Sequence, residues 1–372
     1  MEAVMSGHAV SLSKVADADI DALWQLEQRC FTSDRLSKRR MRFYMSAPHA
    51  EFVLARANGL VVGYALLLCR RGTLLTRLYS IAVDPEARGL GIAAQLIDEL
   101  ERRALLRGKP FMRLEVAVNN RAAIALYEKL GFHQFGIYNH YYEDESDALR
   151  MQKALRMPAS QSKHELYPWY QQSTEFTCGP AALMMAMTSL NKHSNMSQHE
   201  ELTIWRQATT IYMTSGHGGS HPVGLALSAH QRNFEAEVWM NQALPLFTDG
   251  VRSEHKKQII ELVETDFAGQ ARKEGVAIRQ FQWQLSDIET ALDYGKAVVC
   301  LISTYAFDKR KAPHWVVITG VDDQCVYIHD PDPGDDEHVE FQHIPLSRED
   351  FLRLATYGKR KIRTAVIIGP AA

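Results

Sequence analysis

The stretch SIAVDPEARGLGIAAQL, residues 80–96, decides the fold of the first half of the chain. Its apolar residues up to Val83 predict a strand, and the apolar spacing from Ile92 onward predicts a helix. Gly89 and Gly91 allow a tight turn between the two, which gathers unpaired backbone N–H groups at the start of the helix. This arrangement is typical of a pyrophosphate-binding cradle, although a glycine pair before a helix also occurs in plain turns.

The surrounding patterns predict a mixed α/β, or α+β, fold. A hairpin is expected at Asn58-Gly59, because both residues tolerate the positive φ of a type I′ turn. Strands are predicted over 51–57, 60–70, 76–83 and 111–118, and helices over 17–31, 91–108 and 120–132. The first domain is therefore expected to be a sheet partly covered by helices.

The stretch QQSTEFTCGPAALMMAM, residues 171–187, predicts a reactive thiol in the second half. Proline is favoured in the first turn of a helix, so the Cys178 sulfur is expected at a helix amino terminus, where the dipole favours a thiolate. A nucleophilic thiol also needs a base, an orienting group and an oxyanion donor. The candidates for the first two roles are His314 and Asp330, on two successive predicted strands. Gln172 or Gln171 could supply the oxyanion donor, and Gln172 is the better match.

Length and composition set the outer bounds. A chain of 372 residues exceeds what one hydrophobic core usually serves, so we expect two domains, over 8–156 and 166–368, joined by a polar linker at 157–165. A formal charge of −2 gives no overall attraction to nucleic acid or membranes. Five scattered cysteines without a CxxC pair, and no apolar segment long enough for export or membrane spanning, favour the cytoplasm.

The first domain resembles the GNAT acetyltransferase superfamily. The pattern of Arg88, Gly91 and Ala93 after a V-D-P strand end is similar to the acetyl-CoA motif of that superfamily. Residues 114–132 and 138–151 further resemble the ribosomal-protein-alanine N-acetyltransferases. The resemblance implies a GNAT fold, acetyl-CoA as co-substrate, and the amino terminus of a peptide or protein as acceptor.

The resemblance also assigns the residues of this site. Glu115 would be the general base and Tyr127 the general acid, since an amine must lose a proton before attack and a leaving thiolate must gain one. The implied cofactor contacts are Ile81, Ala82, Val83, Arg88, Gly89, Leu90, Gly91, Ile92, Ala93, Ala94 and Asn120. Two alternatives stay open: Glu115 could face solvent at a strand edge, and Tyr127 could be a core tyrosine.

The second domain resembles the double-glycine leader peptidases of bacteriocin exporters and the wider papain-like clan. The resemblance rests on Gln172, Cys178, His314 and Asp330 in this order, and it implies a papain-like cysteine peptidase fold that acts on peptides. The domain is longer than those peptidases, and we assign no purpose to residues 204–239. His217 and His221 could bind a metal, but a glycine-rich loop is the favoured interpretation, so no metal is expected.

Together these patterns predict an acetyl-CoA-dependent N-acetyltransferase fused to a cysteine peptidase. Cleavage by one domain would expose an amino terminus that the other could acetylate. Two alternatives remain: the second domain could be a catalytically idle peptide-binding module, or the acetyl acceptor could be a small-molecule amine. A fold alone does not fix the acceptor.

Overall fold

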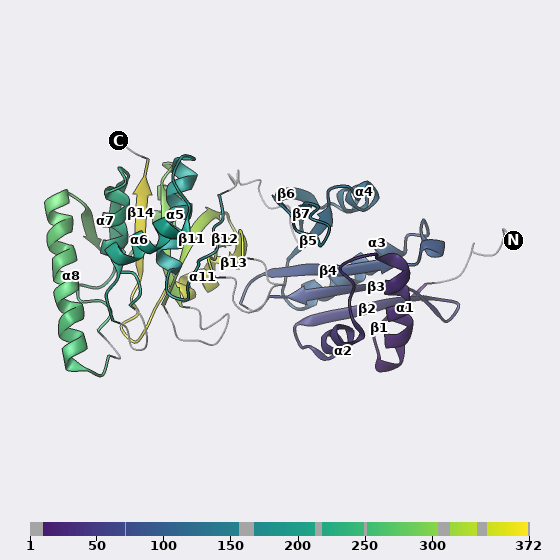
Figure 1. Cartoon of the computed structure of the whole chain (residues 1–372). Helices are drawn as coiled ribbons and strands as arrows, with labels where there is room; N and C mark the ends of the chain where they lie inside the picture. The colour runs from purple at the N-terminus through teal and green to yellow at the C-terminus, as the bar shows by residue number, and fades with distance from the viewer. Residues whose placement is uncertain are drawn as a thin grey trace. The chain divides into compact units, whose positions relative to one another are not determined.

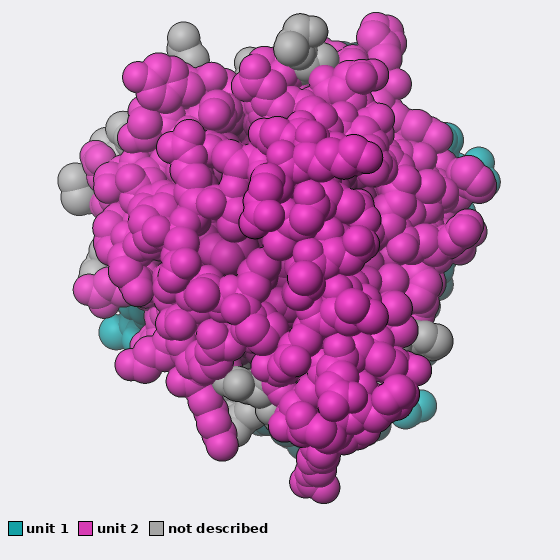
Figure 2. All heavy atoms as spheres, turned by 90° about the vertical axis from the view of Figure 1, so that its left-hand side faces the viewer, with its two compact units in different colours: residues 1–159 teal, residues 160–372 magenta. Residues whose placement is uncertain are grey.

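The computed structural model divides the chain into two compact units, residues 1–159 and 160–372 (Figure 2). It describes residues 10–70, 72–155, 167–212, 218–248, 251–303, 313–332 and 341–370. The predicted linker, 157–165, lies outside these ranges, so the predicted domain boundaries stay a prediction.

Unit 1 contains a seven-stranded sheet in the order β1-β2-β3-β4-β5-β7-β6 (Figure 1). Its strands are β1 (Ser11–Lys14), β2 (Ala50–Ala57), β3 (Leu60–Cys69), β4 (Leu75–Val83), β5 (Phe111–Ala117), β6 (His133–Tyr138) and β7 (Ala148–Ala154). Strands β4 and β5 are parallel and the other neighbours are antiparallel. Asn58 and Gly59 both have positive φ, 52° and 79°, as the predicted β2–β3 hairpin requires.

Helices cover both faces of this sheet. They are α1 (Ile20–Cys30), α2 (Lys38–Ser46), α3 (Ile92–Leu106) and α4 (Arg121–Lys129), with short 3₁₀ turns η1 (Asp17–Asp19) and η2 (Pro85–Ala87). Apolar residues of α1 and α2 pack into one core, and those of α3 and α4 pack into the core on the opposite face. The helices α3 and α4 end before Gly108 and Gly131, whose φ values of 69° and 89° fit a helix carboxyl terminus.

The buried side chain of Glu27 connects α1 to the sheet by a hydrogen bond. Glu27, only 1% exposed, accepts hydrogen bonds from the Tyr64 hydroxyl on β3 and from the Leu36 N–H at 2.7 Å. Burial raises the pKa of Glu27, and the two hydrogen bonds offset this only in part. The native fold therefore favours the protonated form of this side chain.

Unit 2 contains a second seven-stranded sheet, in the order β13-β12-β11-β10-β14-β8-β9. Its strands are β8 (Glu235–Met240), β9 (Ala277–Gln280), β10 (Ala297–Ser303), β11 (Pro313–Val321), β12 (Cys325–His329), β13 (Ile344–Ser347) and β14 (Thr364–Gly369). Only β8 and β9 pair in parallel among the described strands of this unit.

The helices of unit 2 form layers on both faces of that sheet (Figure 1). One core joins it to α5 (Cys178–Leu190), α6 (Gln198–Ala208), α7 (Pro222–His230) and α8 (Glu254–Glu274). The other core joins it to α9 (Leu285–Asp293) and α11 (Arg348–Leu354). Helix α5 is apolar all round because it packs against both β10 and β11 and the helices α6 and α7. None of the described helices is long and apolar enough to cross a bilayer.

Candidate active sites

The turn between β4 and α3 has the backbone shape of an anion-binding loop. Gly89 and Gly91 have φ values of 82° and 74°, and Gly91 is the cap residue before α3. A Cβ atom added to either glycine would meet no protein atom within 4 Å. Glycine is therefore required here by the backbone angle, and the space beside the turn is open.

The first turn of α3 presents unpaired N–H groups to that space. The Gln95 N–H donates to the Gly91 carbonyl at 3.1 Å, so the N–H groups of Ile92, Ala93 and Ala94 precede the first N–H that is bonded within the helix. Three N–H groups at the positive end of a helix dipole suit a phosphate. Arg88 and Leu90 are exposed on the same turn.

The end of β4 has one open edge. Strand β4 pairs with β5 at three positions only, Leu75 to Arg77, whereas its pairing with β3 continues to Val83. Within the described strands, Ile81, Ala82 and Val83 therefore have no strand partner on the β5 side. Backbone N–H and carbonyl groups on such an edge can bind an extended amide chain, which is the chemistry of pantetheine.

Glu115 is buried beside an arginine. Its side chain, on β5, is 4% exposed, and its Oε2 accepts a hydrogen bond from Arg77 Nε on β4 at 2.7 Å. Arg77 also donates to the Tyr141 hydroxyl. The other carboxylate oxygen, Glu115 Oε1, is buried and has no hydrogen-bond partner among the described residues. The solvent-facing alternative for Glu115 is therefore wrong.

Two tyrosine side chains belong to the same neighbourhood. Tyr127 on α4 is 6% exposed and packs edge-on against Phe132, with ring centroids 5.8 Å apart. Burial raises its pKa to about 12, so the phenol carries its proton at neutral pH. Burial also raises the pKa of Tyr142, and the charges of Tyr141, Glu115 and Tyr127 add to this effect. Both phenols therefore carry their protons at neutral pH. Tyr127 also belongs to the apolar core on the α3 and α4 side of the sheet, so the alternative of a core tyrosine stays open.

Asn120 has a structural task of its own. It is the cap residue of α4, and its Oδ1 accepts a hydrogen bond from the Ala123 N–H at 3.2 Å. The cap fixes the side-chain carbonyl and leaves the amide N–H groups to bind a ligand. The predicted cofactor contact and the observed cap are compatible.

The second site joins three side chains from α5, β11 and the end of β12. Cys178 is the first residue of α5, as the Gly-Pro pair that follows it predicts. His314 Nε2 lies 2.7 Å from Asp330 Oδ1, and Cys178 is close enough to the same imidazole to raise its pKa. His314 and Asp330 are each 6% exposed, whereas Cys178 is half-buried. The imidazole thus lies between a thiol and a carboxylate.

The charges around His314 favour its protonated form. Burial lowers the pKa of His314, but the negative charges and hydrogen bonds of Asp330 and Cys178 raise it, and the result lies well above the usual value. An imidazolium beside a sulfur stabilises the thiolate. The protonated imidazole therefore lies between the carboxylate of Asp330 and the thiol of Cys178.

Gln172 lies beside the same loop. Its backbone N–H donates to the Pro331 carbonyl at 2.9 Å, next to Asp330. The side chain is 8% exposed, and its Oε1 has no hydrogen-bond partner within the described part of the chain. A buried amide with unused hydrogen-bonding capacity is available to a ligand.

Comparisons with known proteins decide the families of both units. The Acetyltransferase (GNAT) family matches residues 20–132, and the Peptidase_C39 like family matches residues 167–369. N-alpha-acetyltransferase RimI of Mycobacterium tuberculosis is 33% identical over 148 residues, which are 39% of this chain and 92% of the relative. The chain belongs to the GNAT family and to the Peptidase_C39 like family.

Two further comparisons concern the GNAT unit. The [Ribosomal protein bS18]-alanine N-acetyltransferase of Escherichia coli K12 is 33% identical over 156 residues, 40% of this chain and 99% of that protein. The crystal structure of the ribosomal-protein-S18-alanine N-acetyltransferase from Escherichia coli covers 41% of this chain and 99% of its own, with 27% identity and a TM-score of 0.37. The predicted mixed α/β class and GNAT unit are confirmed, and this unit is an N-acetyltransferase.

The cysteines outside the Peptidase_C39 like site have surroundings that suppress reactivity. Cys69, Cys300 and Cys325 are buried, and Cys30 is half-buried. Burial raises the pKa of all four thiols, to about 12 for Cys300 and Cys325. Within the Peptidase_C39 like unit, only Cys178 has an imidazole and a carboxylate in line with it among the described residues.

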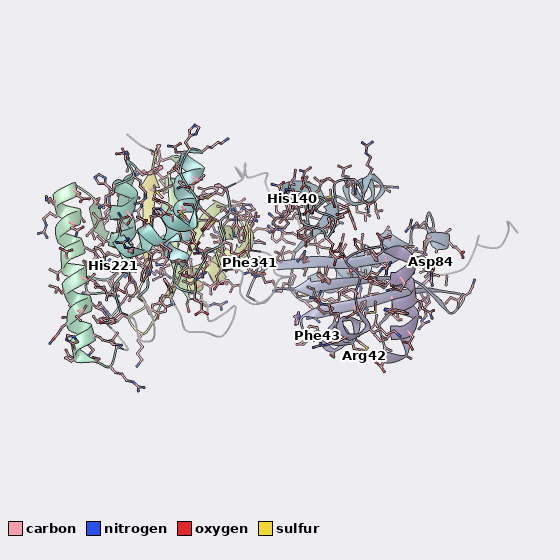
Figure 3. The ribbon with its side chains drawn as sticks, viewed as in Figure 1. Arg42, Phe43, Asp84, His140, His221 and Phe341 are labelled. Atoms are coloured by element: carbon pink, nitrogen blue, oxygen red, sulfur yellow. The ribbon has the colours of Figure 1, made fainter. Side chains whose placement is uncertain are left out.

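The extra segment of the Peptidase_C39 like unit is structural where it is described. It forms the end of α6, helix α7 and strand β8. His221 is fully buried within this unit (Figure 3), where its Nδ1 accepts from the Val223 N–H and its Nε2 lies 3.6 Å from Glu264 on α8. His217 lies outside the described residues, and no group of metal-binding side chains occurs among those that are described.

Two residues of these sites are not apparent from the sequence. Arg77 stands alone in the strand TRLYSIAV, and only its charge in an apolar run could have drawn attention to it. Glu201 on α6 is fully buried in the Peptidase_C39 like unit, where it accepts hydrogen bonds from Tyr170 and Ser173, on either side of Gln172. The charge of Glu201 gives no sign of burial, although its position places it on the same helical face as the buried Ile204 and Ala208.

Proposed function

We propose that this chain acetylates the amino terminus of a peptide or protein with acetyl-CoA in unit 1, and cleaves peptides with Cys178 in unit 2. The observation that carries the second activity is the imidazole of His314, which lies 2.7 Å from Asp330 Oδ1 and close enough to Cys178 for that residue to raise its pKa. The first is supported by the names of the relatives, which act on the amino-terminal alanine of a ribosomal protein or on α-amino groups.

The GNAT unit offers a matching surface for acetyl-CoA. The pyrophosphate would bind the N–H groups at the start of α3, and the pantetheine chain would bind the open edge of β4. Acetyl-CoA supplies the thioester whose acetyl group is transferred. The positive φ of Gly89 and Gly91 shapes this surface, and Arg88 adds a positive charge at its rim.

The remaining residues of that site would transfer protons. Glu115 Oε1 would take the proton from the attacking ammonium group, directly or through water, while Arg77 holds the other oxygen. Tyr127 would give its proton to the departing thiolate, with Tyr142 as a second phenol nearby. The ion pair with Arg77 keeps the carboxylate in one orientation throughout.

In the second unit the reaction would have two steps, attack by Cys178 on the peptide and then hydrolysis by water. The Cys178 sulfur attacks a peptide carbonyl, the Gln172 amide donates to the oxygen that becomes negative, and His314 gives a proton to the leaving amine. Water, deprotonated by His314, then attacks the thioester between Cys178 and the acyl group, which releases the acid and the thiol. Asp330 keeps the imidazole oriented in both steps.

One experiment tests both activities at once. The full chain is incubated with a synthetic peptide library, with and without acetyl-CoA, and the masses of the products are read. We expect shortened peptides in both samples and an added acetyl group only with acetyl-CoA. Acetylation without cleavage would indicate an idle peptide-binding unit, and failure to acetylate any peptide would redirect the search to small-molecule amines.

A further inference from the structure

Two hydrogen bonds hold the segment that carries Gln172 against the loop at Asp330 and Pro331. Trp169 Nε1 donates to the Asp330 carbonyl at 2.9 Å, and the Gln172 N–H donates to the Pro331 carbonyl. These bonds hold residues 169–172 against the loop that carries the third member of the catalytic set. Both acceptors are backbone carbonyls of that loop, so the two bonds fix the position of the segment relative to the loop. A different partner can hold the rest of the segment.

That partner is Glu201. Its Oε2 accepts from the Tyr170 hydroxyl at 2.9 Å and its Oε1 accepts from the Ser173 N–H at 2.8 Å. The first donor lies two residues before Gln172 and the second lies one residue after it. A single carboxylate therefore holds the segment on both sides of Gln172.

The burial of Glu201 needs an explanation, because the side chain is fully buried and has no ion-pair partner among the described residues. Taking a carboxylate out of water costs several kcal/mol unless it is compensated. An apolar side chain of similar volume would fill the same buried space beside α6 without that cost. What only an acceptor can provide here is the pair of hydrogen bonds to Tyr170 and Ser173.

We infer that Glu201 is a positioning residue that aims the Gln172 amide at the peptide carbonyl attacked by Cys178. This inference rests on the proposed peptidase activity. An oxyanion donor contributes only when it meets the developing charge at hydrogen-bond distance, and a displacement of about 1 Å can cost roughly a hundredfold in rate. Glu201 touches neither the sulfur nor the substrate, so its effect must pass through Gln172.

The test uses three variants of the full chain and the library peptide that the wild-type protein cleaves fastest. Glu201→Leu removes both acceptors and should lower kcat on the order of tenfold to a hundredfold, with little change in KM. Glu201→Gln retains one acceptor oxygen and should recover most of that loss. Tyr170→Phe removes one of the two bonds and should give a smaller loss. The rate of Cys178 alkylation by iodoacetamide should be the same in all of them, because alkylation involves no oxyanion.

A double-mutant cycle separates positioning from general stability. If Glu201 acts through Gln172, then Glu201→Leu should cause almost no further loss in a Gln172→Ala background. Losses that multiply in the double variant, or a Cys178 alkylation rate that falls along with kcat, would overturn the inference. If Glu201→Leu does not fold, the same cycle is run with Tyr170→Phe. A wild-type chain that cleaves no peptide would contradict the proposed peptidase instead.

Discussion

The raised pKa of His314 yields a prediction about Cys178. Iodoacetamide near neutral pH should label Cys178 first, because the His314 imidazolium lies beside it, whereas burial raises the pKa of the other four thiols. His314→Ala should slow this labelling at least about tenfold. A time course by mass spectrometry measures it. Labelling of Cys30 as fast as Cys178 would contradict the mechanism.

The acid and base of the GNAT unit can be separated from its cofactor surface. Tyr127→Phe and Glu115→Gln should each lower the turnover of acetyl transfer by about 10²- to 10⁴-fold, with little effect on acetyl-CoA affinity. Turnover and calorimetric titration provide the two numbers. Tyr44→Phe, at a tyrosine that is equally buried on the other face of the sheet, is the control and should retain activity. Wild-type turnover in both site variants would exclude the assigned roles.

At the level of single residues, the sequence predicts those whose neighbours along the chain define them. Cys178 could be predicted because Gly179 and Pro180 mark a helix start. Arg77 and Glu201 could not, because their partners Glu115 and Tyr170 lie 38 and 31 residues away. Such pairs exist only once two elements have packed together.

The glycines that precede and follow α3 allow a matched comparison. Gly91 precedes α3 and Gly108 follows it, both with positive φ and open space around them. Alanine at either position should cost about 1 kcal/mol of stability through backbone strain. Only Gly91→Ala should weaken acetyl-CoA binding, and Gly91→Glu should abolish it. Equal affinities for all variants in a calorimetric titration would refute the cradle.

The buried Glu27 side chain, which links α1 to β3, predicts an effect of pH on stability. Because the pKa of Glu27 is raised by burial, the native state holds a proton more tightly than the unfolded chain. The advantage is complete below the usual value near 4.5 and is lost as the pH rises through the raised pKa. Wild type should therefore lose stability relative to Glu27→Gln as the pH rises above about 4.5. A difference in unfolding free energy that stays constant with pH would contradict this.

Elements with simple apolar patterns match their predictions, and so does β5 although it contains a buried arginine, whereas β6 and β7 are not predicted as strands. Strand β7 contains Arg150, and its neighbour β5 contains Arg113; both are almost fully buried. Their guanidinium groups lie 4.4 and 4.5 Å from the ring centre of Phe135 on β6. Cation–π contacts allow such strands to be polar in sequence and buried in structure. Strand β1 is short and largely exposed, so it has no pattern to recognise.

For the whole molecule, the question is whether joining the two activities in one chain matters. If they share a peptide, the amino terminus freed by Cys178 should be acetylated faster by the same chain than by another, because tethering raises the effective concentration. The comparison is wild type against an equimolar mixture of Cys178→Ala and Tyr127→Phe chains, with acetylated cleavage products quantified by mass. Equal yields at low protein concentration would mean that the fusion brings no kinetic coupling.

The open edge of β4 has a consequence for solubility. Unpaired strand edges are templates for association with other chains, and proteins usually protect them with charges, bulges or short strands. Here the open edge follows directly on the positions at which β4 pairs with β5, so it is short. A short edge offers few backbone groups to a foreign strand, but enough for a chain with a few amides. The GNAT unit can thus keep backbone groups free for a ligand without inviting aggregation.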